Sequence, residues 1–187
     1  MDFAKVFSSH PKVTVELGMG DGRLLESLAK NDSGLYVGIE LNSEQCGQAR
    51  SRIALDNVLI LDGSFEDIVP AFPDTSVDRF VAVLPDPAYI DEKKQDRWKP
   101  FYKVVNAKLK PGGTFQLVTE MTDELLQPVS DGDYERWSGW LAKSFSSIGF
   151  IVDRREGAPA RYSSRCLDQF RGDPERIRIV TLDMAKQ

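Results

Sequence analysis

The sequence predicts a single α/β domain with a seven-stranded, mostly parallel sheet and helices on both faces. Apolar runs of strand length alternate with helix-like segments along the chain, which is the pattern of βαβ units. The 187 residues suffice for one domain with a core large enough to fold alone. A glycine-rich turn follows the first apolar run and leads directly into a helix-like segment.

The first half of the chain alternates strand and helix three times. Strands are expected at residues 12–17, 35–39 and 58–61, and helices at residues 22–30, 43–53 and 65–69. Ser43 can serve as the N-cap of the second helix, because its hydroxyl can accept hydrogen bonds from the first free backbone amides.

The second half contributes four further strands. They are expected at residues 79–84, 114–119, 150–153 and 176–182, with helices at residues 97–109 and 134–147. The run at 79–84 is the most continuously apolar, so we expect it at the centre of the sheet, buried on both faces. Pro85 and Pro87 end it, and Pro111-Gly112-Gly113 turns the chain into the next strand. The last two strands are expected to form an antiparallel pair at one edge.

Charge and composition exclude several classes of protein. The chain carries 24 basic and 29 acidic residues, a net charge of −5, which disfavours strong nonspecific binding to DNA or RNA. A local basic face is still compatible with this balance. Seven arginines could form such a face or simply a solvated surface, and the sequence leaves both open: Arg154, Arg155, Arg161, Arg165, Arg171, Arg176 and Arg178.

The chain shows no sign of a membrane or secreted protein. No apolar run approaches the roughly 20 residues that span a bilayer, and residues 1–6 lack the features of a secretory signal. We therefore expect a cytoplasmic protein in which Cys46 and Cys166 are reduced thiols rather than a disulfide or metal ligands.

The glycine turn at residues 15–22 indicates a ligand site. Glycines between a strand and a helix let the backbone approach a ligand closely, and Glu40, after the second strand, can accept hydrogen bonds from ribose hydroxyls. The third glycine comes one residue too early for a dinucleotide motif, and Glu16 and Asp21 would repel a pyrophosphate. The same carboxylates would attract the ammonium and sulfonium groups of S-adenosylmethionine.

A second candidate site follows the fourth strand, at residues 84–89. Ligands of open α/β sheets bind outside the carboxyl ends of the strands. Two prolines fix the backbone on either side of Asp86 and would hold its carboxylate in a set direction at that edge.

Four segments resemble the bacterial-type tRNA (guanine-N7)-methyltransferase family, in the same order. They are ELGMGDGRLLESLAK, YVGIELN, LPDPAYIDEKKQDRW and LKPGGTFQLVTE, and the resemblance covers roughly residues 13–125. It implies a Rossmann-like class I methyltransferase domain over residues 1–187, with a cofactor half at about 12–84 and a substrate half at about 85–187. It also implies S-adenosylmethionine as cofactor and RNA, most simply tRNA, as partner. No DNA, membrane or metal is expected, and the protein can be a monomer or a homodimer.

The resemblance assigns roles by position. The cofactor residues would be Glu16, Gly18, Gly20, Gly22, Glu40, Leu41, Asn42, Ser64, Phe65 and Leu84. Asp86 would be the catalytic residue, lying between cofactor and guanine, and Glu120 would contact the substrate. Basic residues suited to RNA phosphates are Lys93, Lys94, Arg97 and Arg161, with Tyr89, Trp98 and Tyr162 as aromatic candidates for stacking. For Trp98 we favour a place in the core.

The sequence departs from the family at several positions, which leaves alternatives open. Ser64-Phe65 stands where the family has an acid, and Ala88 stands where it has tryptophan. Ala160 and Ser163 replace the family's Thr and Glu. Alternatives to tRNA guanine N7 are a base of ribosomal RNA, a small-molecule acceptor, or a weakly active cofactor-binding partner subunit.

Overall fold

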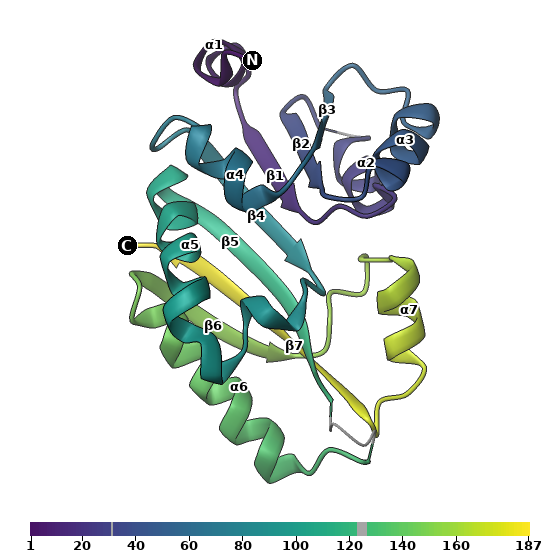
Figure 1. The fold of residues 1–187 in the computed structure, drawn as a ribbon, viewed down its shortest axis with the longest axis vertical. Helices are drawn as coiled ribbons and strands as arrows, with labels where there is room; N and C mark the ends of the chain where they lie inside the picture. Colours follow the sequence, from purple (N-terminus) through teal and green to yellow (C-terminus); the bar gives the residue numbers. More distant parts are fainter. Residues whose placement is uncertain (31, 123–126) are drawn as a thin grey trace.

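The computed structural model describes residues 1–30, 32–122 and 127–187 and contains the expected seven-stranded sheet (Figure 1). The strands are β1 (Val13–Leu17), β2 (Leu35–Glu40), β3 (Val58–Asp62), β4 (Val77–Val83), β5 (Leu109–Thr122), β6 (Phe150–Glu156) and β7 (Ile177–Lys186). Their order in the sheet is β3-β2-β1-β4-β5-β7-β6. Strands β1 to β5 pair in parallel, and β7 runs antiparallel to both β5 and β6.

The helices lie between the strands, as expected for βαβ units. They are α1 (Phe3–Ser8), α2 (Arg23–Ala29), α3 (Ser43–Arg52), α4 (Phe65–Ile68), α5 (Gln95–Lys108), α6 (Asp131–Ser146) and α7 (Arg165–Arg171), with short 3₁₀ turns η1 (Val69–Ala71), η2 (Pro87–Tyr89) and η3 (Glu92–Lys94). Among the described residues, none of these helices has the length and apolar character needed to cross a bilayer.

The predicted position of β4 is confirmed. It pairs with β1 on one side and β5 on the other, and Phe80, Val81 and Ala82 are at most 1% exposed. Because β1 to β5 are parallel, their carboxyl ends meet at one edge of the sheet. The connections that follow β1, β2, β3 and β4 therefore start at the same edge.

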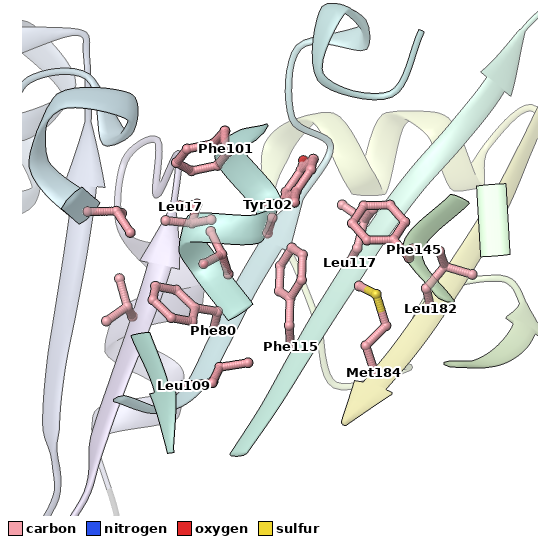
Figure 2. Close-up of a cluster of buried hydrophobic side chains, with 14 of the residues drawn as sticks. Leu17, Phe80, Phe101, Tyr102, Leu109, Phe115, Leu117, Phe145, Leu182 and Met184 are labelled. Carbon is pink, nitrogen blue, oxygen red and sulfur yellow. The ribbon is translucent and has the colours of Figure 1, made fainter. Parts of the chain in front are cut away.

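Helices cover both faces of the sheet. Aromatic side chains of α5 and α6 pack on one face in the main hydrophobic cluster. Tyr102 and Phe145 are labelled in Figure 2, and Trp98 belongs to the same cluster. Trp98 is 1% exposed, which confirms its place in the core. Helices α2 and α3 pack on the opposite face through Leu25 and Ala49. Tyr162 and α7 pack there too, against β4 and β5.

Some local predictions were wrong. Asn42, not Ser43, caps α3: its side chain accepts from the amides of Glu44 and Gln45. The predicted turn at residues 111–113 lies inside the longer strand β5, where the pairing with β4 shifts register. Helices α1 and α7 were not expected, because each is short and lacks a long apolar period.

Gly38 on β2 is required by the packing of two neighbours. A Cβ placed there would lie 2.3 Å from Met19 Sδ and 2.7 Å from Leu25 Cδ2, so the glycine lets the turn after β1 and helix α2 approach the sheet. We expect Gly38→Ala to lower the free energy of unfolding by about 1–3 kcal/mol in urea titrations. Gly47→Ala is the matched control: nothing lies within 4 Å of that Cβ, and alanine favours helix α3 by up to about 1 kcal/mol. Equal effects of the two substitutions would contradict this reading of Gly38.

Candidate functional site

The turn after β1 has the conformation that its glycines predicted. Gly18, Gly20 and Gly22 adopt φ angles of 71°, 56° and 75°, a left-handed region that side chains with a Cβ disfavour. Gly22 is also the N-cap residue of α2. The turn therefore keeps its backbone close to the carboxyl edge of the sheet and open toward the space above it.

A pocket of about 660 Å³ opens beside this turn. Three groups of residues form its walls: the turn with the end of β1, the end of β2 with the start of α3, and the end of β4 with α7. The lining residues are Glu16, Gly18, Met19, Gly20, Asp21, Leu24, Glu40, Asn42, Glu44, Gln45, Gln48, Val83, Leu84, Ser164, Cys166 and Gln169. The structure thus brings the predicted residues Glu16, Gly18, Gly20, Glu40 and Asn42 together in one cavity, with Leu84 opposite.

Glu16 is a buried acid in the wall of this pocket. Its side chain is on β1 between β2 and β4 and the residue is 3% exposed. Its Oε2 atom has no hydrogen-bond partner among the described residues. Burial raises the pKa of the Glu16 carboxyl well above its ordinary value, and the charges of Asp21 and Glu40 raise it further, although a hydrogen bond from the Leu25 amide lowers it.

Such an orphaned carboxylate is costly unless a partner arrives. A cation in the pocket would supply the missing contact to Oε2 and would offset the repulsion of the Glu16 carboxylate by Asp21 and Glu40. Glu44 adds a fourth carboxylate to the lining. The pocket is therefore suited to a positively charged ligand and poorly suited to a phosphate.

Glu40 ties the glycine turn to the end of β2. Its two carboxylate oxygens accept from the amides of Gly20 and Asn42, each at 2.9 Å. A carboxylate oxygen has two lone-pair sites, so these bonds leave capacity for a hydroxyl donor. The neighbouring Leu41 is 72% exposed and does not line the pocket, although it stands beside the mouth as the residue between Glu40 and Asn42.

Leu84 directly follows β4 and has a strained backbone conformation. Its φ of 53° is in the left-handed region, which costs a residue with a Cβ roughly 1–2 kcal/mol. A hydrogen bond from its amide to the Val118 carbonyl, 2.8 Å long, holds this geometry. The side chain lines the pocket, and the chain then turns away toward Asp86.

Asp86 is exposed and caps the 3₁₀ turn η2. Its Oδ1 accepts from the Ala88 amide at 2.8 Å, so the predicted fixed direction of this carboxylate arises from a local hydrogen bond as well as from the two prolines. Asp86 does not line the pocket. It stands two residues beyond Leu84, which does.

Glu120 lies near the carboxyl end of β5, the strand next to β4. Burial raises the pKa of its carboxyl, and the backbone and the Thr119 hydroxyl, 3.5 Å from Oε2, lower it. Glu120 is outside the pocket lining. The end of β5 and the loop after β4 thus place two carboxyl groups along the same edge of the sheet, beyond Leu84.

Ser64 and Phe65 form local structure rather than a wall of the pocket. Ser64 caps α4 by accepting from the Glu66 amide. Phe65 packs against Tyr89 and Phe101, with ring centroids 4.8 and 5.0 Å away. Phe65 thus connects the loop after β3 with the loop that carries Asp86, and Tyr89 is half-buried in that contact.

The predicted basic residues divide into free and paired groups. Lys93 and Arg97 are exposed, and no ion pair is recorded for either within the described part of the chain. Lys94 pairs with Asp91 at 3.1 Å. Arg161 is exposed and lies over the ring of Tyr162, 5.8 Å from its centroid. Lys93 and Arg97 are thus available to an anionic partner on the Asp86 side.

Most of the late arginines have protein partners, which argues against a continuous basic face. Arg154 pairs with Glu135, Arg155 with Asp183, Arg171 with Asp168, Arg176 with Asp173, and Arg178 with both Asp131 and Glu156. The prediction of Tyr162 as a stacking residue is wrong. It is fully buried, and its hydroxyl bonds to Gln116 and Arg79.

Sequence reasoning missed the third wall of the pocket. Ser164, Cys166 and Gln169 line it from the β6–β7 connection, more than 120 residues after the glycine turn. Buried Tyr162 anchors this connection to the sheet, and Arg171 donates to the carbonyls of Tyr162 and Pro159. In the sequence, Tyr162 stands as an aromatic residue among small and polar ones, which is a weak signal that this connection packs against the sheet.

Comparison with known proteins identifies the family. The family model described as "Putative methyltransferase" matches residues 10–137. The tRNA (guanine-N(7)-)-methyltransferase of Salmonella typhi is 31% identical over 169 residues, which are 85% of this chain and 68% of that protein. The protein of the same name from Yersinia enterocolitica is 29% identical over 127 residues, 64% of this chain and 53% of that protein. The chain therefore spans about half the length of some curated relatives that it matches.

Solved structures show the same fold over nearly the whole chain. An antibiotic-related methyltransferase superimposes with a TM-score of 0.68 at 19% identity, covering 98% of this chain and 92% of the other. A 30S ribosomal A1408 methyltransferase from an uncultured bacterium gives a TM-score of 0.66 at 19% identity, with coverages of 98% and 92%. At such identities the likeness concerns the fold. The family model and the Salmonella relative, together with this fold, show that the chain belongs to the tRNA (guanine-N7)-methyltransferase family of class I S-adenosylmethionine-dependent methyltransferases.

Proposed function

We propose that this protein transfers a methyl group from S-adenosylmethionine to RNA, with N7 of a tRNA guanine as the acceptor. The observation that carries the proposal is the orphaned, buried carboxylate of Glu16 beside the glycine turn, in a pocket with three further acids. The named relatives are tRNA (guanine-N(7)-)-methyltransferases, and the exposed Lys93 and Arg97 suit phosphate groups of RNA.

The residues present fit the proposed donor. Glu16 and the Gly18–Gly22 turn would hold its methionine part, Glu40 would accept from the ribose hydroxyls, and Leu41 would lie near the adenine. Bound S-adenosylmethionine supplies a methyl group activated by a sulfonium. Leu84 would separate this pocket from the acceptor side, where Asp86 and Glu120 lie.

The acceptor side needs to orient a base rather than to deprotonate it. Guanine N7 has a free lone pair, so no general base is required. Asp86 would accept from the N–H edge of the guanine, and its negative charge would stabilise the positive charge that develops on the ring as N7 is methylated. Lys93, Lys94, Arg97 and Arg161 would contact phosphates, which Lys94 can do only in competition with Asp91.

The two halves of the domain would bind different substrates. Residues 12–84 would hold most of the donor and residues 85–187 the acceptor. Helix α7 is the exception, because it belongs to the second half and lines the donor pocket. We propose that the protein acts in the cytoplasm, where tRNA is modified, as a monomer or a homodimer.

The test is incubation of the protein with labelled S-adenosylmethionine and separate pools of tRNA, ribosomal RNA and metabolites, followed by nucleoside analysis. Label in 7-methylguanosine from tRNA supports the proposal. Label in an adenine of ribosomal RNA or in a metabolite alone would replace guanine N7 with that acceptor. No label in any pool, despite donor binding, would favour a partner subunit.

The donor affinity should depend on pH through Glu16. Its pKa is raised above 4.5 in the free protein, and a bound cation would stabilise the carboxylate and so lower this pKa. Binding then releases a proton, and affinity rises as pH increases through the raised value. Calorimetry from pH 5 to 8 should show this rise for S-adenosylmethionine and a smaller one for S-adenosylhomocysteine, which lacks the sulfonium charge. If the affinity for the two compounds depends on pH to the same extent, the sulfonium charge does not interact with Glu16.

A further inference from the structure

The third wall of the donor pocket carries a thiol. Cys166 is a free, exposed cysteine on α7, and it lines the same cavity as Glu16, Glu40 and Glu44. The unpartnered Oε2 of Glu16 shows independently that this cavity is arranged for a ligand. A group attached to the sulfur would therefore extend into space that the ligand needs.

The charges around the pocket determine which reagents can reach this thiol. Glu16, Asp21, Glu40 and Glu44 all line the cavity, and among the residues whose side chains the structure describes no lysine or arginine does. Arg23 and Arg52 form ion pairs with Asp21 from outside the lining, so they partly offset the field of its carboxylate in the pocket. The remaining acids favour entry of cations and oppose entry of anions, by a factor that typically reaches about tenfold or more in such clefts.

We propose that Cys166 is a modification site for small, positively charged or neutral thiol-reactive compounds, and that its modification closes the pocket to the methyl donor. The second part rests on the proposed function. The covalent step with an alkyl methanethiosulfonate is balanced: the Cys166 thiolate attacks the sulfenyl sulfur, a disulfide forms, the S–SO₂ bond breaks, methanesulfinate leaves, and the thiol proton goes to water.

The other cysteine provides an internal control. Cys46 is fully buried in α3, and its thiol donates to the Glu40 carbonyl. Burial raises the pKa of the Cys46 thiol, which further reduces its reactivity. Labelling of the folded protein should therefore reach one cysteine quickly, and a Cys166→Ser variant should label slowly.

The experiment compares three reagents on the full chain: trimethylammonium-ethyl, methyl and sulfonato-ethyl methanethiosulfonate. Each rate, read by intact mass, is divided by the rate with N-acetylcysteinamide, which removes intrinsic differences among reagents. We expect the normalised labelling rate to be highest for the cationic reagent, intermediate for the neutral one and lowest for the anionic one. The highest and lowest rates should differ about tenfold, and this difference should shrink at high salt. Glu44→Gln should narrow this difference by less than about threefold, because Glu44 is exposed and water screens its field. An anionic reagent as fast as the cationic one would overturn the proposed selectivity.

The blocking effect is tested by calorimetry on the methyl-thio adduct. We expect the adduct to bind S-adenosylmethionine at least about tenfold more weakly than unmodified protein. The affinity of Cys166→Ser for the donor should be the same before and after the treatment, and the donor should slow labelling of the unmodified protein. Unchanged affinity of the adduct would overturn the blocking effect. Failure of unmodified protein to bind the donor would instead refute the proposed function, and the charge order would still test the thiol site. If Cys166→Ser is misfolded by circular dichroism, Cys166→Ala replaces it.

Discussion

Glu16→Gln is expected to weaken S-adenosylmethionine binding about 10- to 100-fold and, at the same time, to stabilise the free protein. Glutamine keeps the size of the side chain and can still accept from the Leu25 amide. It removes the charge that would face the cationic donor. Isothermal titration at neutral pH measures the first effect directly.

The gain in stability follows from the same burial. The folded protein raises the pKa of Glu16, so the stability that its neutral form contributes is fully present below pH 4.5 and is lost as pH rises through the folded value. Glutamine does not titrate, so the variant does not lose this stability as pH rises. The free energy of unfolding should increase by an amount on the order of 1 kcal/mol at pH 7, and by much less at pH 4.

Glu44→Gln is the matched control for Glu16→Gln. It removes the same charge from the same pocket, but Glu44 is exposed at the start of α3, where water screens its field. Donor affinity should change less than about threefold and stability hardly at all. If the two variants bind the donor equally well, burial of Glu16 is irrelevant to the site and the proposed role of its carboxylate is wrong.

Asp86→Asn is expected to lower the rate of methyl transfer by about 100-fold or more while leaving donor affinity unchanged. Asparagine keeps an oxygen that can accept from the Ala88 amide, so the cap of η2 survives and only the charge is lost. Asp86 lies outside the donor pocket, which is why binding should not change. Single-turnover methylation of tRNA and titration calorimetry separate the two quantities.

Two further variants distinguish charge from turn geometry. Asp86→Ala removes both charge and cap, and the lost cap should cost about 1 kcal/mol of stability. Asp91→Asn is the control, because Asp91 caps η3 through the Lys93 amide in the same way. At saturating tRNA it should leave the rate of methyl transfer nearly intact, although it frees Lys94 from its ion pair. If Asp86→Asn is fully active and only Asp86→Ala is impaired, Asp86 shapes the loop and does not act on the acceptor.

Local patterns were sufficient to predict the sheet and the donor end of the site. The apolar runs predicted the strands to within a few residues, because each run must be buried wherever it lies in the fold. The Gly18–Gly22 turn and Glu40 were predictable for a similar reason: a left-handed backbone and an acid after β2 are visible in the residues themselves. The boundaries of β5 and the cap of α3 were not, since hydrogen bonding and pairing decide them.

The far wall of the pocket depended on tertiary structure. Nothing adjacent to Cys166 in the sequence indicates that it faces Glu16, about 150 residues earlier; packing of Tyr162 against the sheet brings them together. The late arginines likewise resemble a polyanion site in the sequence, yet carboxylates from other elements neutralise most of them. The sequence by itself determined the fold class and the chemistry of the donor site, because both follow from short-range patterns of polarity and glycine. Which charges remain free, and which residues close the cavity, was decided only by contacts between distant segments.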